Sequence, residues 1–262
     1  MLKNCSISLY NTSVNNIPIT HTLKCNSKNY EQRSSRDIKY IVIHYTGNVK
    51  DTALANARYF ANNSTSSSAH FFVDENNIYQ SINLKDIAWH CGCSLGYKNT
   101  ACRNSNSIGI EMCTSGNALV SQITQNNAAQ LTADLCYLLG ISAAEVDKYV
   151  LRHYDIVASN KKCPAQFVTY PEQWKKFKNK IKELINKKQK EMKEEMTQED
   201  FNRMMAQYFI DASKEKEDSW ATEAIKWAKA KGMIAGNNSM PKKPVTREEV
   251  VTMIYRVFKD KI

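Results

Sequence analysis

The sequence lacks any run of about 18 consecutive apolar residues, the length needed for a membrane-spanning helix. We therefore expect no membrane insertion. Residues 1–6 (MLKNCS) contain a lysine but no apolar stretch after it, so we expect no secretory signal peptide. These two absences predict a protein that is made and kept in a cytoplasm until something releases it.

A disulfide framework is also not expected, although the chain contains 8 cysteines. Without a secretion signal, reduced thiols are the default state. The densest cysteine segment, Cys91-Gly92-Cys93 with Cys102 nearby, lacks the second close Cys or His pair that completes a structural zinc site. We interpret this segment as a loop with free thiols, with metal binding as the alternative.

The charges are unbalanced, because 36 Lys and Arg residues against 26 Asp and Glu residues give a formal net charge of +10. Such an excess predicts an anionic partner that is attracted over long range. The lysines are not interleaved with aromatic residues and no nucleic-acid-binding motif is present, so we do not expect nucleic acid to be this partner. Much of the excess lies in Lys161-Lys162, in residues 175–190 and at the C-terminal end.

Alternating strand and helix patterns predict an α/β fold with a mixed central β-sheet flanked by helices. Short apolar, β-branched runs predict strands, and a polar turn between two of them predicts a hairpin. Apolar residues at helical spacing predict helices, the second of which ends at Gly140. The expected strands are 39–44, 69–74, 76–80, 107–113 and 149–152, the expected helices are 52–61 and 124–139, and residues 1–35 form an arm with an early strand around 17–19.

The composition changes in the last third of the chain. Lys and Glu dominate residues 174–198, where a few apolar residues supply one helix face. We expect one domain over residues 1–180, a charged helical linker over 181–196 and a small all-α domain over 197–262. The expected helices of that domain are 198–210, 220–231 and 246–258, and a capping box at Thr246–Glu249 begins the third.

Three residues of the first domain can together hold a zinc ion. His44 and His153 each follow an apolar strand, and Cys163 ends a polar loop, 154–163, that can fold back towards His153. Two imidazoles and one thiolate leave the fourth tetrahedral position of zinc open for water. A lone His is more often structural and a lone Cys is usually a small buried hydrophobe. The combination predicts a catalytic Zn²⁺ site between two strand ends and a loop.

Three separated motifs carry a family resemblance. They are residues 41–46 (IVIHYT), residues 107–111 (SIGIE), and residues 152–155 (RHYD) followed by 161–164 (KKCP). In this order they resemble the zinc-dependent N-acetylmuramoyl-L-alanine amidases of the type-2 amidase family, which includes phage endolysins, bacterial autolysins and peptidoglycan recognition proteins. The resemblance implies cleavage of the amide bond between N-acetylmuramic acid and L-alanine of the stem peptide.

Glu111 and Lys161 are the predicted catalytic residues. Glu111 is the only carboxylate in an otherwise apolar strand, and partial desolvation raises the pKa of a Glu towards the range useful for proton transfer. The resemblance places the catalytic glutamate there, and places at Lys161 rather than Lys162 the lysine that stabilises the negative oxygen of the tetrahedral intermediate. A solvent-facing Glu and a solvated Lys are the alternatives.

Other residues are predicted to contact the substrate. Some members of the family have a catalytic tyrosine where this chain has Ala69, which leaves more of the proton transfer to Glu111. His70 begins an apolar strand and is predicted to orient water or substrate, with a structural role as the alternative. Trp89 and His90 resemble a segment that lines the substrate groove of the family, and they are predicted to contact glycan or peptide.

The C-terminal segments 219–236 and 244–249 resemble an S-layer homology repeat, which implies attachment to anionic secondary polymers of the Gram-positive wall. The alternative is that Trp220, Trp227, Met253 and Tyr255 fill a small helical core. We expect peptidoglycan and these polymers as partners, and we leave open a homo-oligomer formed through the C-terminal helices.

The resulting hypothesis is an endolysin-type peptidoglycan hydrolase, made without a signal peptide in the host bacterial cytoplasm and released to the cell wall, with the help of a holin if it is a phage protein. A host autolysin of the same activity is a close alternative. A non-catalytic peptidoglycan recognition protein is less favoured, because such proteins lose the zinc cysteine and this chain keeps Cys163.

Overall fold

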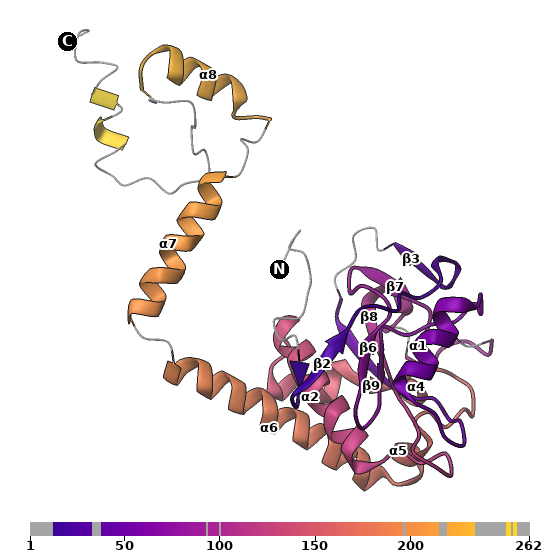
Figure 1. The fold of residues 1–262 in the computed structure, drawn as a ribbon. Helices are drawn as coiled ribbons and strands as arrows, with labels where there is room; N and C mark the ends of the chain where they lie inside the picture. Colours follow the sequence, from indigo (N-terminus) through magenta and orange to yellow (C-terminus); the bar gives the residue numbers. More distant parts are fainter. Residues whose placement is uncertain are drawn as a thin grey trace. The chain divides into compact units, whose positions relative to one another are not determined.

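The structure is a computed structural model that describes residues 13–32, 38–92, 94–99, 101–195, 198–214, 219–233, 250–252 and 254–255. The chain divides into two compact units, Met1–Lys190 and Glu191–Ile262 (Figure 1). The domain boundaries expected at 180 and 196 stay predictions.

A seven-stranded sheet forms the centre of the first unit and confirms the predicted mixed sheet. Its spatial order is β1 (Ser13–Val14), β2 (Ile17–Thr20), β6 (Ile78–Gln80), β5 (Phe71–Val73), β8 (Ser107–Met112), β4 (Tyr40–Tyr45) and β9 (Val150–Arg152). Strand β4 pairs in parallel with β8 and β9, whereas β5 and β6 form the predicted antiparallel hairpin. The carboxyl ends of β4, β8 and β9 therefore meet at one edge of the sheet, where open α/β sheets bind ligands.

Helices flank this sheet, as predicted. The predicted helix 124–139 begins slightly earlier, because the Ser121 side chain accepts a hydrogen bond from the Thr124 amide and caps the helix at Gln122. Gly140 follows the helix with a φ of +70°, a conformation that glycine adopts without strain. The helices that begin in the first unit are α1 (Ala53–Asn62), α2 (Gln122–Leu138), α3 (Val146–Tyr149), α4 (His153–Ile156), α5 (Ala165–Thr169) and α6 (Pro171–Glu195), with 3₁₀ turns at Ser27–Asn29, Asn104–Asn106 and Ala143–Glu145. Residues 191–195 of α6 belong to the second unit.

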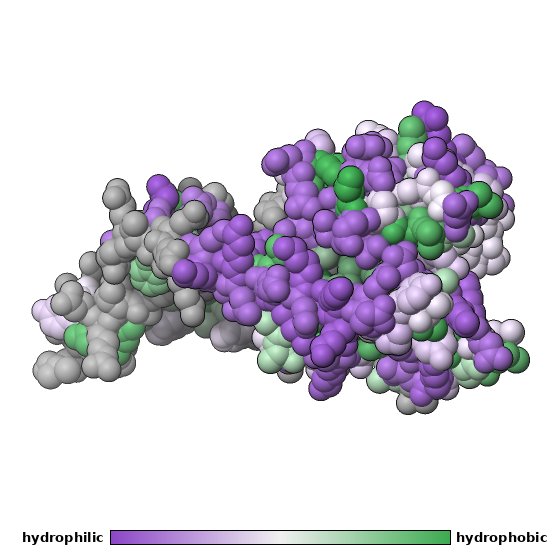
Figure 2. Space-filling model, turned by 90° about the horizontal axis from the view of Figure 1, so that it is seen from below, coloured by the Kyte–Doolittle hydropathy of each residue, from purple (hydrophilic) through white to green (hydrophobic). Residues whose placement is uncertain are grey.

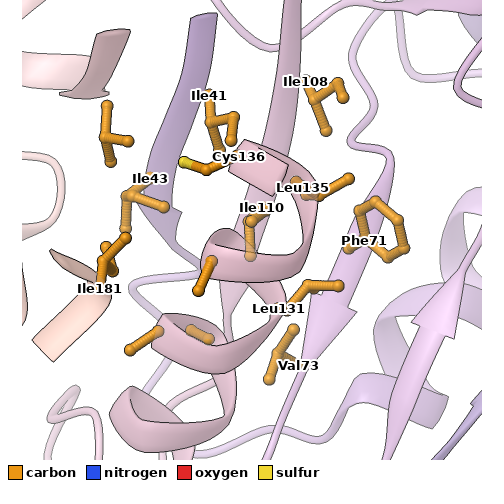
Figure 3. Close-up of a cluster of buried hydrophobic side chains, with 14 of the residues drawn as sticks. Ile41, Ile43, Phe71, Val73, Ile108, Ile110, Leu131, Leu135, Cys136 and Ile181 are labelled. Carbon is orange, nitrogen blue, oxygen red and sulfur yellow. The ribbon is translucent and has the colours of Figure 1, made fainter. Parts of the chain in front are cut away.

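The main core lies between one face of the sheet and helices α2 and α6. Successive strand residues point to opposite faces, so every second residue of β4, β5 and β8 enters this core. The buried side chains labelled in Figure 3 are Ile41, Ile43, Phe71, Val73, Ile108 and Ile110 of the strands, Leu131, Leu135 and Cys136 of α2, and Ile181 of α6. Burial of Ile181 and Ile185 shows that this core includes part of the segment predicted as a linker.

The opposite face of the sheet carries the other strand residues. Val42 of β4 and Gly109 of β8 are register partners on this face, and Phe72 of β5 packs there against Ala53 and Ala57 of α1. The packing of helices on both faces accounts for the near-continuous apolar sequence of the central strands.

Two features of the first unit differ from the prediction. A separate two-stranded sheet joins β3 (Tyr30–Gln32) to β7 (Asp86–Ala88), in segments without a strong strand signal. Residues 154–156, predicted as loop, are helical because the Asp155 carboxylate accepts hydrogen bonds from the Arg152 backbone amide and guanidinium and so caps α4.

The second unit contains α7 (Gln198–Lys214) and α8 (Thr222–Ala230), close to two of the predicted helices. Of the predicted helix 246–258, residues 250–252 and 254–255 are helical, and the capping box and Met253 lie outside the described residues. Trp220 is 83% exposed, Trp227 52% and Tyr255 64%, so the alternative in which these three residues fill a core is wrong.

The surface seen from below is mainly hydrophilic, with hydrophobic residues in small separate patches (Figure 2). Within the described parts of the chain, no helix has both the length and the apolar character required to cross a membrane.

Candidate metal and catalytic site

His44 and Glu111 lie side by side at the carboxyl ends of two neighbouring strands. They are register partners between β4 and β8, and both point to the sheet face opposite the main core. The His44 ring is buried, and its Nδ1 lies 3.9 Å from Glu111 Oε1. The strand register alone therefore brings together a predicted metal ligand and the predicted catalytic carboxylate.

His153 and Cys163 complete a three-residue cluster with His44. His153 is the first residue of α4, directly after β9, and its ring centroid lies 4.8 Å from that of His44. The Tyr154 amide donates a 2.9 Å hydrogen bond to the Cys163 carbonyl, which closes the intervening loop. Cys163 Sγ lies 3.8 Å from His44 Nδ1. The three side chains are buried, and their donor atoms all lie within 4.8 Å of one another.

The donor atoms of this cluster fit a metal ion. Both ring nitrogens of His153 and Oε2 of Glu111 are buried without a hydrogen-bond partner. Buried polar atoms are normally paired, so unpaired buried atoms at this place fit a site that binds a ligand. Two imidazole nitrogens and one thiolate are a donor set that Zn²⁺ accepts in catalytic sites. Among the described residues, this is the one group of His, Cys, Asp and Glu side chains that meets the geometric requirement for holding a metal.

The electrostatics of the cluster keep its histidines neutral. Burial, followed by the charges of His153, His90 and Lys161, holds the pKa of His44 well below its ordinary value. Burial and then the charge of Lys161 lower the pKa of His153 to about 4. Neutral imidazole is the form that binds a metal.

Burial, and then the nearby Glu111 charge, raise the pKa of the Cys163 thiol to about 12. A thiol that binds a metal loses its proton, because the cation reverses this balance. Metal binding at this cluster is therefore coupled to proton release.

Glu111 has the titration behaviour of a general acid or base. Burial raises its pKa to about 7, and the charge of Lys161 opposes part of that rise. Although Oε2 is buried, 22% of the Glu111 side chain remains exposed. A carboxyl group that titrates near neutral pH can both accept and donate a proton during a reaction.

Lys161 is exposed and lies in the loop before Cys163. Its charge contributes to the pKa values of His44, Glu111, His153 and Cys163, whereas Lys162 is not among the main contributors to any of them. This difference supports the predicted choice of Lys161 over Lys162 as the lysine beside the site.

The structure does not bring His70 and His90 to the surface of the site. His70 is fully buried; its Nδ1 accepts a hydrogen bond from the Gly109 amide and its Nε2 faces the Asp86 carbonyl. His90 is also buried, and its Nδ1 lies 3.0 Å from His44 Nε2. These contacts contradict the predicted substrate contacts of both histidines and give them structural positions behind the site.

Trp89 is partly exposed, and its indole Nε1 donates to Glu31 Oε1. A substrate contact for Trp89 stays a prediction. Ser107, at the start of β8, was not predicted to contribute to the site, but its Oγ lies 3.2 Å from His90 Nε2. The sequence carried no signal for this contact except the place of Ser107 on the strand that leads to Glu111.

Comparison with known proteins places this geometry in a family. The N-acetylmuramoyl-L-alanine amidase family (Amidase_2) matches residues 34–166. The amidase CwlL of Bacillus licheniformis is 35% identical over 162 residues, which are 58% of this chain and 42% of CwlL. The amidase XlyA of Bacillus subtilis strain 168 is 36% identical over 141 residues, 53% of this chain and 42% of XlyA. The chain thus spans less than half the length of these curated relatives.

Solved structures agree with the sequence comparison. The catalytic domain of XlyA is 31% identical and superposes with a TM-score of 0.50 over 63% of this chain and 99% of that domain. PlyL is 26% identical with a TM-score of 0.50 over 63% of this chain and 98% of PlyL. Since the family match covers about half of the sequence and includes the metal-ligand candidates, this chain belongs to the N-acetylmuramoyl-L-alanine amidase family.

Proposed function

We propose that this protein is a zinc-dependent, endolysin-type amidase that cleaves peptidoglycan between N-acetylmuramic acid and L-alanine of the stem peptide. The observation that carries the proposal is the buried His44, His153 and Cys163 cluster, whose donor atoms lie within 4.8 Å of one another. The two buried ring nitrogens of His153, which have no hydrogen-bond partner, support the same conclusion. The activity for which the family is named supports the substrate class.

The chemical difficulty is the amide bond, whose carbonyl is a poor electrophile and whose leaving amine needs a proton. A zinc ion held by His44, His153 and Cys163 would supply polarisation of the carbonyl and a bound water of lowered pKa. In this proposal Glu111 would take a proton from the attacking water and give it to the departing amine. Its pKa of about 7 suits both transfers near neutral pH.

Lys161 would stabilise the negative charge that develops on the carbonyl oxygen, since its own positive charge already acts on all the groups of the site. Position 69 does not supply a phenol: Ala69 is buried at the site of the tyrosine present in some relatives. The proton transfers therefore fall to Glu111 in this chain.

Product analysis tests the proposed activity. Purified Gram-positive peptidoglycan is incubated with the native protein, with chelator-treated protein and with Cys163→Ala. The expected result is new N-terminal alanine without new reducing sugar, lost in both controls and restored to the chelated protein by Zn²⁺. Cys136→Ala is the matched variant, because Cys136 is equally buried but lies in the core between the sheet and α2, and it should keep the activity.

New reducing ends in the native digest would mean a glycosidase and would overturn the proposal. Binding to peptidoglycan without any cleavage would instead favour a recognition protein.

We further propose that the second unit binds secondary wall polymers. Its exposed Trp220 and Trp227 lie in the segment that resembles an S-layer homology repeat, which supports this role. The test is co-sedimentation of the full chain with walls before and after removal of phosphodiester-linked polymers. Trp220→Ala with Trp227→Ala should reduce binding only to intact walls, whereas Tyr59→Ala, another exposed aromatic residue on α1, should not. Equal binding to stripped walls would contradict this assignment.

A further inference from the structure

A buried chain of hydrogen bonds runs from the back of His44 to a backbone carbonyl. His44 Nε2 lies 3.0 Å from His90 Nδ1, His90 Nε2 lies 3.2 Å from Ser107 Oγ, and Ser107 Oγ lies 2.6 Å from the Arg103 carbonyl oxygen. The three side chains are 2%, 7% and 0% exposed, respectively. The two links between side chains are buried and the link to the Arg103 carbonyl is partly buried, so each atom of the chain must have a defined role as donor or acceptor.

The direction of these bonds follows from the last link. A carbonyl oxygen only accepts, so the single hydroxyl proton of Ser107 is donated to Arg103. The Ser107 oxygen must then accept from His90, which puts the His90 proton on Nε2 and leaves Nδ1 as an acceptor. His90 Nδ1 in turn requires a proton on His44 Nε2. The remaining nitrogen of neutral His44, Nδ1, then carries a lone pair.

Two neighbours hold the His90 ring in place. The Cys91 thiol lies 3.2 Å from His90 Nδ1 and 3.7 Å from Ser107 Oγ, so it packs against two of the polar atoms in the chain. The ring also lies against the backbone of β8 at Gly109, where an added Cβ would be only 2.6 Å from His90 Cγ. Glycine at this position thus permits the close approach that places His90 behind His44.

We propose that His90 and Ser107 are positioning residues that fix His44 in the Nε2-protonated tautomer, so that the Nδ1 lone pair faces His153 and Cys163. The 3.8 Å separation between His44 Nδ1 and Cys163 Sγ places that lone pair on the side of the cluster. The consequence for metal binding rests on the proposed function, whereas the tautomer is a property of the metal-free protein. In proteins that bind metals, such outer partners typically change the affinity about 10- to 100-fold.

The first test is a two-dimensional ¹H–¹⁵N spectrum of the imidazole rings in the metal-free, full-length protein. We expect His44 to carry its proton on Nε2, with a Ser107→Ala variant giving a mixture of tautomers. Protonation of His44 on Nδ1 in the native protein would overturn the proposal. This measurement needs neither zinc nor enzymatic activity, so it stands even if the protein proves not to be an amidase.

The second test is zinc affinity, measured by competition with a chromogenic chelator. We expect Ser107→Ala to weaken binding about tenfold or more, because His44 no longer has a single tautomer. Thr132→Val is the matched control: Thr132 is also buried and its hydroxyl donates to a backbone carbonyl, that of Ala128, but it lies on α2 and is not part of the chain to His44. Ser107→Thr, which keeps the hydroxyl, should restore the affinity.

Thermal unfolding of the metal-free variants separates positioning from loss of fold. Similar losses of stability in Ser107→Ala and Thr132→Val, with weaker zinc binding only in the first, would support the positioning role. Unchanged zinc affinity in a folded Ser107→Ala would contradict it. Normal zinc affinity in the native protein without amide cleavage would refute the proposed function and leave this inference intact.

Discussion

Two groups of buried polar side chains meet at His44 and differ in how their atoms are paired. On the front, both ring nitrogens of His153 and Oε2 of Glu111 have no hydrogen-bond partner. On the back, His90 and Ser107 have partners at each of the ring nitrogens and the hydroxyl that form the chain to Arg103. The two groups lie on either side of one imidazole ring.

This difference distinguishes side chains that take part in the reaction from side chains that hold them in position. A buried polar atom without a partner costs about 1–3 kcal/mol, so a protein keeps several together mainly where a bound ligand will pair them. A fully paired group costs little and holds its neighbours rigidly. We therefore expect substitutions at the front to affect the reaction and substitutions at the back to affect metal affinity and stability.

The largest effect is expected for Glu111→Gln at the front. An amide cannot take up or release the proton, so the rate of amide cleavage should fall about 10²- to 10⁴-fold. Zinc content should stay the same, because Glu111 is not one of the three clustered donors. Glu75→Gln, on the loop between β5 and β6, is the control and should leave the rate unchanged. A loss of zinc in Glu111→Gln would mean that Glu111 helps to hold the metal, and would contradict a role in proton transfer alone.

A somewhat smaller effect is expected at Lys161, which lies at the front but donates to no atom of the cluster. Loss of one charge-stabilising donor costs about 10²- to 10³-fold in rate, and Lys161→Met should show that loss. Lys162→Met is the matched variant, since its charge is not a main influence on the four site groups. The rates are measured as kcat on soluble muropeptides. Equal losses in both variants would mean that the total positive charge of the loop, and not Lys161 in particular, supports the reaction.

The back of His44 is tested by Gly109→Ala. The added Cβ would lie 2.6 Å from His90 Cγ, so the ring must move away from His44. We expect about tenfold weaker zinc binding and a free energy of unfolding lowered by about 1–3 kcal/mol. In Gly116→Ala the added Cβ would have no atom within 4 Å, so this variant serves as the control. Chelator competition measures the zinc affinity and urea unfolding measures the stability. A Gly109→Ala variant that cannot be distinguished from Gly116→Ala would show that His90 does not support His44.

The smallest effect is expected for a paired group far from His44. Hydrogen bonds from Lys178 and Lys182, each with an N–O distance of 2.5 Å, lower the pKa of Asp147. A lowered pKa stabilises the fold above the ordinary Asp range, near 4, and this stabilisation is lost as the pH falls through the folded-state pKa. Because Asp147 is 55% exposed, Asp147→Asn should lower the unfolding free energy at pH 7 by only about 0–1 kcal/mol. The rate of amide cleavage should not change. A changed rate would mean that catalysis depends on the contact between Asp147 and the lysines of α6.

The strands and the front of the site were predictable from the sequence. Short β-branched runs mark β4 and β8, and the residues that follow such runs in parallel strands meet at one edge of the sheet. That is why His44 and His153 converge as predicted. Cys163 was placed correctly because its loop returns to His153.

The back of the site was not predictable in the same way. The His44 and His90 contact joins residues 46 positions apart, and the segment of His90 has no periodic pattern that shows which way its ring points. The two-stranded β3–β7 sheet was not predicted for a related reason. Its strands are only three residues long and, within the described part of the chain, pair only with each other. The start of α4 was missed because the Asp155 cap was not recognised as a helix start.

The close approach of the His90 ring to Gly109 has an evolutionary consequence. Neither position can change alone without cost: a side chain at 109 displaces the ring, and loss of the ring leaves space over a strand that glycine already weakens. Across natural relatives, substitutions at these two positions should be correlated, as they are for residues in direct contact. Histidine at 90 should occur with glycine at 109, and lineages that acquire a larger residue at 109 should have replaced the histidine as well.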